Sequence, residues 1–75
     1  MPRARFRIEN NIRALRFAHD EMTQQALADR IGVSRQTVNA IEGGKYSPTL
    51  EVAFQIAEVF EKPLEEVFTF RRVTR

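Results

Sequence analysis

The stretch of residues 23–46 constrains the fold more than any other, because it has the pattern of two short helices joined by a tight turn. Thr23 is a residue type that caps helices, so we expect the first helix over residues 24–31. Gly32 follows it and can adopt the left-handed backbone conformation that ends a helix. Within this helix, three apolar residues recur at the spacing of one helical face: Leu27, Ala28 and Ile31.

The second helix of the pair is expected to begin after Ser34, which can cap it, and to end at the glycines that follow residue 42. Its apolar residues Val38 and Ile41 lie three positions apart and so share one face. The polar residues of the same helix must then lie on the opposite face. The two-helix motif therefore spans about residues 23–42.

With these positions in place, the chain resembles the helix-turn-helix proteins of the Cro and phage-repressor (XRE-like) family. The match rests on the residue spacing above and on three runs: TQ at 23–24, SRQTVNAIE at 34–42 and GKYSP at 44–48. The order of segments from about residue 8 to 70 is similar to small stand-alone regulators of the cytolysin-repressor type. The resemblance implies a mainly α fold, a five-helix lambda-repressor-like DNA-binding domain.

The length and the residues that are missing limit what such a domain can do. Seventy-five residues make a single domain, 1–75, with one small core and no room for a separate catalytic or ligand-binding module. There is no cysteine, and His19 is the only histidine, so we expect no metal site and a solvated His19 at a helix end. No nucleophile–base pattern or glycine-rich phosphate loop occurs, so we expect neither an enzyme nor a cofactor. The chain has no apolar run long enough to span a membrane and no leader, which favours a cytoplasmic protein.

The charge is unevenly distributed along the chain. The net charge is +2, but residues 1–46 sum to +3, residues 47–68 to −4 and residues 69–75 to +3. A basic front with an acidic back suits a protein that turns one face to a polyanion. A solvated surface of mixed charge would give the same count. The helix-turn-helix pattern favours the polyanion.

Both chain ends alternate in character with period two. Residues 3–8 alternate basic and apolar side chains, which predicts a short strand, with a free basic arm for the DNA minor groove as the alternative. Residues 68–73 alternate with aromatic side chains and predict a second strand, unless the terminus frays. Two lone strands with apolar faces should pair, which gives a small two-stranded antiparallel sheet. The cytolysin-repressor resemblance supports this sheet.

Three further helices surround the motif. The first is capped by Asn10 or Asn11, and its expected faces are Ile12, Leu15 and Ala18 inward with Arg13 and Arg16 outward. A helix after Thr49 is apolar over more than half its surface, so burial on two sides is expected. The last helix is short and begins with Pro63 at its first position.

The resemblance implies that the second helix of the motif enters the DNA major groove with its first turns. The candidate base contacts are the polar residues there: Ser34, Arg35, Gln36, Thr37 and Asn39. Arg35 can donate two hydrogen bonds to guanine, and Gln36 can make a bidentate pair with adenine. Ser34 can equally serve as a cap alone, and Asn39 as a solvated residue.

Residues beside the reading helix are candidates for other roles that the resemblance implies. Gln24 lies where this family contacts the DNA backbone, and it can also brace the second helix. The candidate phosphate contacts are Thr23, Gln24, Lys45 and Tyr46. Arg16 and Glu42 match positions that pair with each other, and near the surface such a pair contributes about 0–1 kcal/mol.

These observations predict a sequence-specific, double-stranded-DNA-binding transcriptional regulator, a repressor that reads a palindromic operator as a homodimer. The expected dimer interface lies on the last helix and strand: Leu64, Val67, Phe68 and Phe70. The alternative is a protein-interaction module, for instance an antitoxin, that holds a partner with the apolar surfaces of its last two helices. The sequence does not identify an effector or a partner protein.

Overall fold

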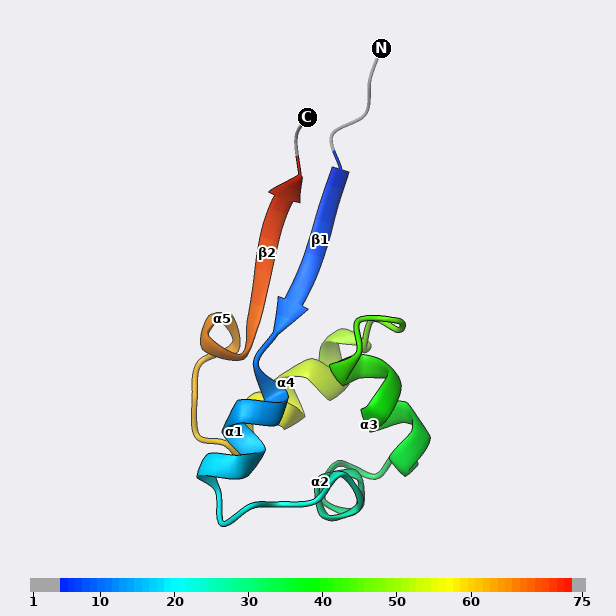
Figure 1. Ribbon diagram of the computed structural model, residues 1–75, viewed down its shortest axis with the longest axis vertical. Helices are drawn as coiled ribbons and strands as arrows, with labels where there is room; N and C mark the ends of the chain where they lie inside the picture. The colour runs from blue at the N-terminus through cyan, green and yellow to red at the C-terminus, as the bar shows by residue number, and fades with distance from the viewer. Residues whose placement is uncertain (1–4, 74–75) are drawn as a thin grey trace.

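The computed structural model describes residues 5–73 and confirms the predicted mainly helical fold with a two-stranded antiparallel sheet (Figure 1). The elements of this part follow in the order β1 (Arg5–Asn10), α1 (Ile12–Ala18), α2 (Gln24–Ile31), α3 (Arg35–Glu42), α4 (Leu50–Val59), α5 (Leu64–Val67) and β2 (Phe68–Val73). The expected strand at residues 3–8 overlaps β1, although residues 3 and 4 lie outside the described part. No helix within residues 5–73 is long and apolar enough to cross a membrane.

Local side-chain hydrogen bonds explain where the three central helices begin. The hydroxyl of Thr23 accepts a hydrogen bond from the backbone N–H of Ala26 at 3.0 Å, and Ser34 accepts one from Thr37 at 3.1 Å. Thr49 caps α4 in the same way. Each bond satisfies an N–H group that has no partner within its own helix.

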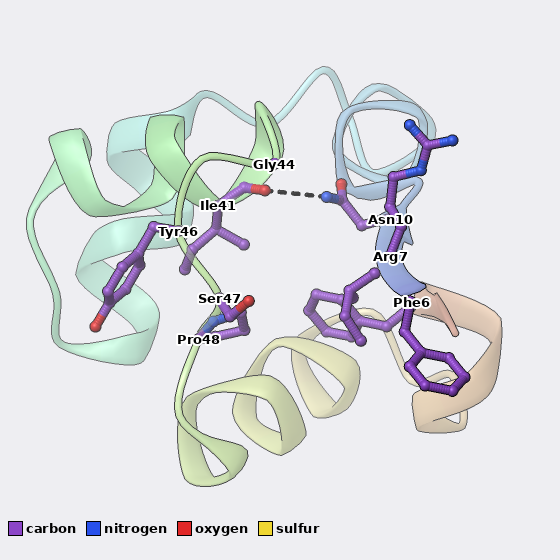
Figure 2. Close-up of a pocket in the computed structure, with 10 residues that line it drawn as sticks. Phe6, Arg7, Asn10, Ile41, Gly44, Tyr46, Ser47 and Pro48 are labelled. Atoms are coloured by element: carbon purple, nitrogen blue, oxygen red, sulfur yellow. Dashed lines mark hydrogen bonds between the residues drawn. The ribbon is translucent and has the colours of Figure 1, made fainter. Parts of the chain in front are cut away.

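The first helix is capped by Asn10 and not by Asn11. Asn10 Oδ1 accepts from the backbone N–H of Ile12 at 3.1 Å, whereas Asn11 makes no side-chain cap bond. The amide nitrogen of Asn10 donates to the carbonyl oxygen of Ile41 at 3.0 Å, as Figure 2 shows. The junction of β1 and α1 is therefore tied to the last turn of α3.

One apolar core lies between the helices, and each helix contributes to it. Its most fully buried large side chains are Ile12, Leu27, Val38, Ile41, Ile56 and Val67. The expected inward face of α1 is partly wrong, since Ala18 is exposed and Arg16 is buried, with 7% of its surface exposed. A helix of two turns can hold only a narrow stripe against the core, and Ile12, Leu15 and Arg16 occupy it.

Helix α4 uses only one of its two apolar sides within the chain. Ala53, Ile56 and Ala57 pack into the core, but Leu50 is 68% exposed and Phe54 is 54% exposed. Leu50 and Phe54 are four residues apart, so they lie next to each other on the outer side of the helix. The second apolar side of α4, which was also predicted to be buried, is therefore exposed in the single chain.

The two strands form an antiparallel ribbon that projects away from the helical body (Figure 1). Phe6 pairs with Arg72, and Ile8 pairs with Phe70. The rings of Phe6 and Phe70 stack at 4.7 Å between centroids. Their common face is mainly apolar and exposed, but it also carries Arg72, whose guanidinium lies over the Phe6 ring at 5.7 Å from its centroid. The opposite face carries an ion pair between Arg71 and Glu9 at 3.1 Å. The strand prediction therefore holds over residues 5–10, in place of a free arm.

Candidate nucleic-acid interface

Helix α3 divides sharply into a buried and an exposed side. Val38 and Ile41 are 1% and 2% exposed and fix the helix against the core. Arg35, Gln36 and Asn39 are exposed on the other side. Because the apolar side is held by the core, the polar side keeps one orientation relative to the rest of the molecule. A rigid, polar helix surface of this kind can enter a DNA groove.

The side chains of Arg35 and Gln36 are available to a ligand. They occupy the first two positions of α3, and within residues 5–73 no hydrogen bond or ion pair engages either side chain. The guanidinium and the carboxamide therefore keep their full hydrogen-bonding capacity. Both groups suit bidentate contacts to purine edges in the major groove.

The hydroxyl groups at the start of α3 are already used within the chain. Ser34 Oγ accepts from the Thr37 backbone N–H, and the two hydroxyls lie 2.9 Å apart, within hydrogen-bonding distance. Thr37 is also half-buried. These two predicted base contacts therefore have a structural role, and each could contact DNA only in addition to it.

A hydrogen-bonded network joins α1, α2 and α3 behind the exposed surface. The guanidinium of Arg16 pairs with both carboxylate oxygens of Glu42, with Nη2 3.0 Å from Oε1. Its Nη1 donates to the Met22 carbonyl oxygen at 2.7 Å. Gln24 Nε2 donates to Glu42 Oε1 at 3.1 Å and to Asn39 Oδ1 at 3.2 Å. The Arg16 side chain points inward, contrary to the expectation that it lies on the outer face of α1.

The predicted phosphate contacts lie at the edges of α3. Thr23 and Gln24 begin α2, and the Gln24 side chain reaches the middle of α3 through Asn39. Lys45 follows the end of α3, where its backbone N–H donates to the Ala40 carbonyl at 2.9 Å and holds the loop in place. Tyr46 is 51% exposed, and Figure 2 shows its ring pointing away from the β1 side chains.

The predicted dimer surface is only partly exposed. Phe70 is 65% exposed, and Leu64 and Phe68 are half-buried. Val67 is wrongly included, because it is 1% exposed and packs in the core of its own chain. Leu64 and Val67 are three residues apart and so lie on the same side of α5, but only Val67 is fully covered by the core.

An apolar groove adjoins this surface, and of its lining residues only Leu64 and Phe68 were predicted to lie in an interface. It has a volume of about 330 Å³ and is lined by Ile8, Ser47, Pro48, Leu50, Ala53, Leu64 and Phe68. A second pocket of about 330 Å³ lies between β1 and the loop after α3, and Figure 2 shows the residues around it. The excess of apolar residues in α4 was the available signal for the groove, and the strand alternation was the signal for Ile8.

The structure gives no indication of a metal centre in the part of the chain that it describes. No cluster of three metal-ligating side chains occurs among the described residues. His19 is exposed at the end of α1 and packs its ring edge against Phe60, with centroids 5.4 Å apart.

Comparison with known proteins relates this architecture to DNA-binding proteins. A helix-turn-helix family model matches residues 12–67. An uncharacterized HTH-type transcriptional regulator of Methanocaldococcus jannaschii is 44% identical over 63 residues, which cover 84% of this chain and 94% of the relative. A second uncharacterized HTH-type regulator, YgzD of Bacillus subtilis, is 41% identical over 61 residues, covering 81% of this chain and 91% of the relative. The crystal structure of a candidate DNA-binding protein from Bacteroides fragilis has the same fold, with a TM-score of 0.71 at 22% identity over 83% of this chain and 98% of that one.

Proposed function

Because the chain belongs to the XRE-like helix-turn-helix family of non-enzymatic, DNA-binding transcriptional regulators, we propose that it is a repressor that recognises a palindromic operator as a dimer. A repressor of this kind acts by occupying its site on the DNA. A repressor must share a compartment with the DNA that it binds, and a cytoplasmic location is proposed on that ground.

The observation that carries this proposal is the pair of free side chains at the start of α3. Arg35 and Gln36 lie on a helix whose opposite face is buried, and neither is engaged by another described residue. We assign Arg35 to guanine and Gln36 to adenine, because their donor and acceptor patterns match those bases in the major groove. Ser34, Thr37 and Asn39 complete the set of proposed base contacts.

Phosphate contacts are proposed at the start of α2 and in the loop that follows α3. The positive end of the α2 dipole, next to Thr23 and Gln24, suits a phosphate on one side of the groove. Lys45 and Tyr46, exposed after α3, suit a phosphate on the other side. Contacts of this kind position the protein but carry no sequence information.

The dimer is proposed to form on the apolar groove and the adjoining face of the ribbon. Leu50, Phe70 and Phe6 leave half or more of their surfaces in water, and Leu64 and Phe68 border the same region. A soluble monomer rarely exposes a continuous apolar surface of this kind. One recognition helix also reads too few base pairs to select a site in a genome, whereas two helices related by a twofold axis read a palindrome.

The same apolar groove favours a second candidate function, a protein-interaction module that holds a different partner there. The two functions differ in what they require of α3. An interaction module has no use for the free Arg35 and Gln36 side chains. Absence of DNA binding at low salt would leave this second function as the better one.

The experiment that tests the proposal begins by selecting bound sequences from a random DNA pool. At the selected site, Arg35→Ala and Gln36→Ala should each lose on the order of 1–3 kcal/mol of binding free energy and flatten the preference at one base pair. Lys45→Ala should weaken all sequences alike and reduce the salt slope by about one. Lys62→Ala is the matched control, because Lys62 is also exposed but lies in the acidic segment before α5. Equal effects of all four variants on sequence preference would contradict the proposed roles.

A further inference from the structure

The network between α1 and α3 ends at a proposed DNA-contacting residue, Asn39. Arg16 pairs with Glu42, Gln24 donates to Glu42 at 3.1 Å, and Gln24 also donates to Asn39 at 3.2 Å. Arg16 and Glu42 have 8% and 10% of their side-chain surfaces exposed, and Asn39 is exposed. A buried charged pair is therefore connected to the reading surface through a single carboxamide.

The direction of each hydrogen bond in this chain follows from chemistry. The oxygen and nitrogen of a carboxamide are distinguished by their hydrogen-bond partners. Glu42, paired with a guanidinium, is an acceptor only, so Gln24 must turn Nε2 toward it. The second hydrogen of the same nitrogen points to Asn39, which must therefore present Oδ1. The carboxylate thus sets the orientation of an amide that it does not touch.

We propose that this network fixes Asn39 as a hydrogen-bond donor toward DNA, which contacts an acceptor through Nδ2 and does not make the bidentate pair with adenine. The inference rests on the proposed function, since it assigns the chemistry of one base contact. A bidentate pair needs Oδ1 and Nδ2 to face the groove together. With Oδ1 turned toward α2, only Nδ2 is free to do so.

The acceptor can be a base atom or a phosphate oxygen. Guanine N7 and O6 and thymine O4 are acceptors in the major groove, whereas cytosine presents a donor at N4. A cytosine opposite Asn39 is therefore the expected mismatch. Adenine, which keeps the N7 acceptor, gains no advantage over guanine from this residue.

The network also changes the role of Gln24. Both hydrogens of Nε2 are used within the protein. The remaining atom, Oε1, can only accept a hydrogen bond, and a DNA phosphate has no hydrogen to donate to it. The side chain of Gln24 is therefore a positioning group for Asn39. The phosphate contact at this end of α2 falls to backbone N–H groups of the first turn, which have no partner within the helix.

The first test uses the free protein, so its outcome does not depend on DNA binding. Hydrogen exchange of side-chain amides, measured by NMR, should show both Gln24 Nε2 protons exchanging several times more slowly than those of the exposed Gln36. The Asn39 Nδ2 protons should exchange as fast as those of Gln36, because they face solvent. Protected Asn39 protons with fast Gln24 protons would mean the opposite polarity and overturn the inference. A protein that passes this test but binds no DNA would refute the proposed function alone.

The second test measures binding to four versions of the operator that differ in the base pair at one position. That position is the one at which Asn39→Ala loses the base preference of the wild-type protein. Wild-type protein should disfavour cytosine there by roughly tenfold. Gln24→Met, which keeps the side-chain length but frees Asn39 to turn over, should reduce this discrimination to within about threefold. If the acceptor is a phosphate, the four operator versions should bind with equal affinity. Replacing that phosphate with a neutral methylphosphonate should then weaken DNA binding by the wild-type protein but not by Asn39→Ala. An adenine preference that needs Asn39 and survives Gln24→Met would overturn the inference.

Discussion

Arg16 is the residue whose role depends most on its surroundings. It is a cation placed in an apolar core, and its side chain is satisfied by Glu42 and by the Met22 carbonyl oxygen. A surface pair of this kind would contribute about 0–1 kcal/mol, as the sequence led us to expect. Burial changes that estimate, because removing one partner leaves the other as an uncompensated charge.

We therefore expect Arg16→Met to lower the free energy of unfolding by about 3–5 kcal/mol. Glu42→Leu should have an effect of similar size, since it strands the Arg16 guanidinium. The double variant should recover much of the loss, because two apolar side chains of similar volume leave no unpaired charge. Urea unfolding of the four proteins at one protein concentration measures the coupling. Strictly additive single effects would show that the pair does not act as a unit.

The local residues of the site could be predicted from residue type and spacing, whereas the Arg16–Glu42 pair and the bracing role of Gln24 came only from the family resemblance. Thr23, Ser34 and Gly32 act within a few residues of their own position, so residue type and spacing indicate their roles. The pairing of Arg16 with Glu42 followed from a family resemblance, and nothing in the periodicity indicated that Arg16 is buried. The reason is physical: its partners lie 26 and 6 residues away, and only packing brings them together.

At the scale of elements, the turn between α2 and α3 depends on one backbone conformation. Gly32 has a φ of 75°, in the left-handed region, and its N–H donates to the Ala28 carbonyl at 2.9 Å. A Cβ added at this position would meet no atom within 4 Å. The cost of substitution is therefore conformational and not steric.

Gly32→Ala should lower the free energy of unfolding by about 1–2 kcal/mol, the cost of a left-handed non-glycine residue. Gly43→Ala is the matched control at the end of α3, where φ is −80° and an added Cβ would meet the Asn39 carbonyl at an ordinary 3.4 Å. It should be nearly neutral or slightly stabilising, because alanine restricts the unfolded chain. Thermal unfolding of both variants measures the difference, and an equal loss in both would refute the conformational explanation.

Element types were predictable where periodicity was strong, while some boundaries were not. The strand expected at 3–8 extends in the structure to Asn10, because Glu9 and Asn10 pair with Thr69 and Phe68. Alternation cannot reveal that register, since it depends on a strand about 60 residues away. Pro63 likewise caps α5 from outside and is not its first residue, because its ψ of 156° is extended.

At the scale of the whole molecule, the structure is asymmetric in its surface chemistry. The helical body is compact, and the ribbon extends the molecule to 45 Å along one axis against 21 and 19 Å along the others. One face of the ribbon is mainly apolar, apart from Arg72 over the Phe6 ring, and continues into the apolar groove. The other face carries Arg7, Glu9 and Arg71. The sequence indicated surplus apolar surface, but it could not separate Val67, which the core covers, from Phe70, which it does not.

The final prediction is that the protein is a twofold dimer and that Leu50→Asp separates it into monomers. Leu50 is 68% exposed beside the apolar groove and occupies the first position of α4, where a carboxylate favours the helix. The variant should therefore keep its thermal unfolding transition while losing the dimer. Phe17→Asp is the control, since Phe17 is 52% exposed on α1, away from the groove. Light scattering at micromolar concentration should give a dimer for wild type and Phe17→Asp and a monomer for Leu50→Asp.

The same variant should also lose affinity for the full operator. A dimer contacts two half-sites roughly 34 Å apart, about ten base pairs, at the same time. The Leu50→Asp monomer contacts one, so it should bind the full operator little better than a single half-site. A wild-type monomer both free and on DNA would refute the dimer, and a dimeric Leu50→Asp would refute its placement on the groove.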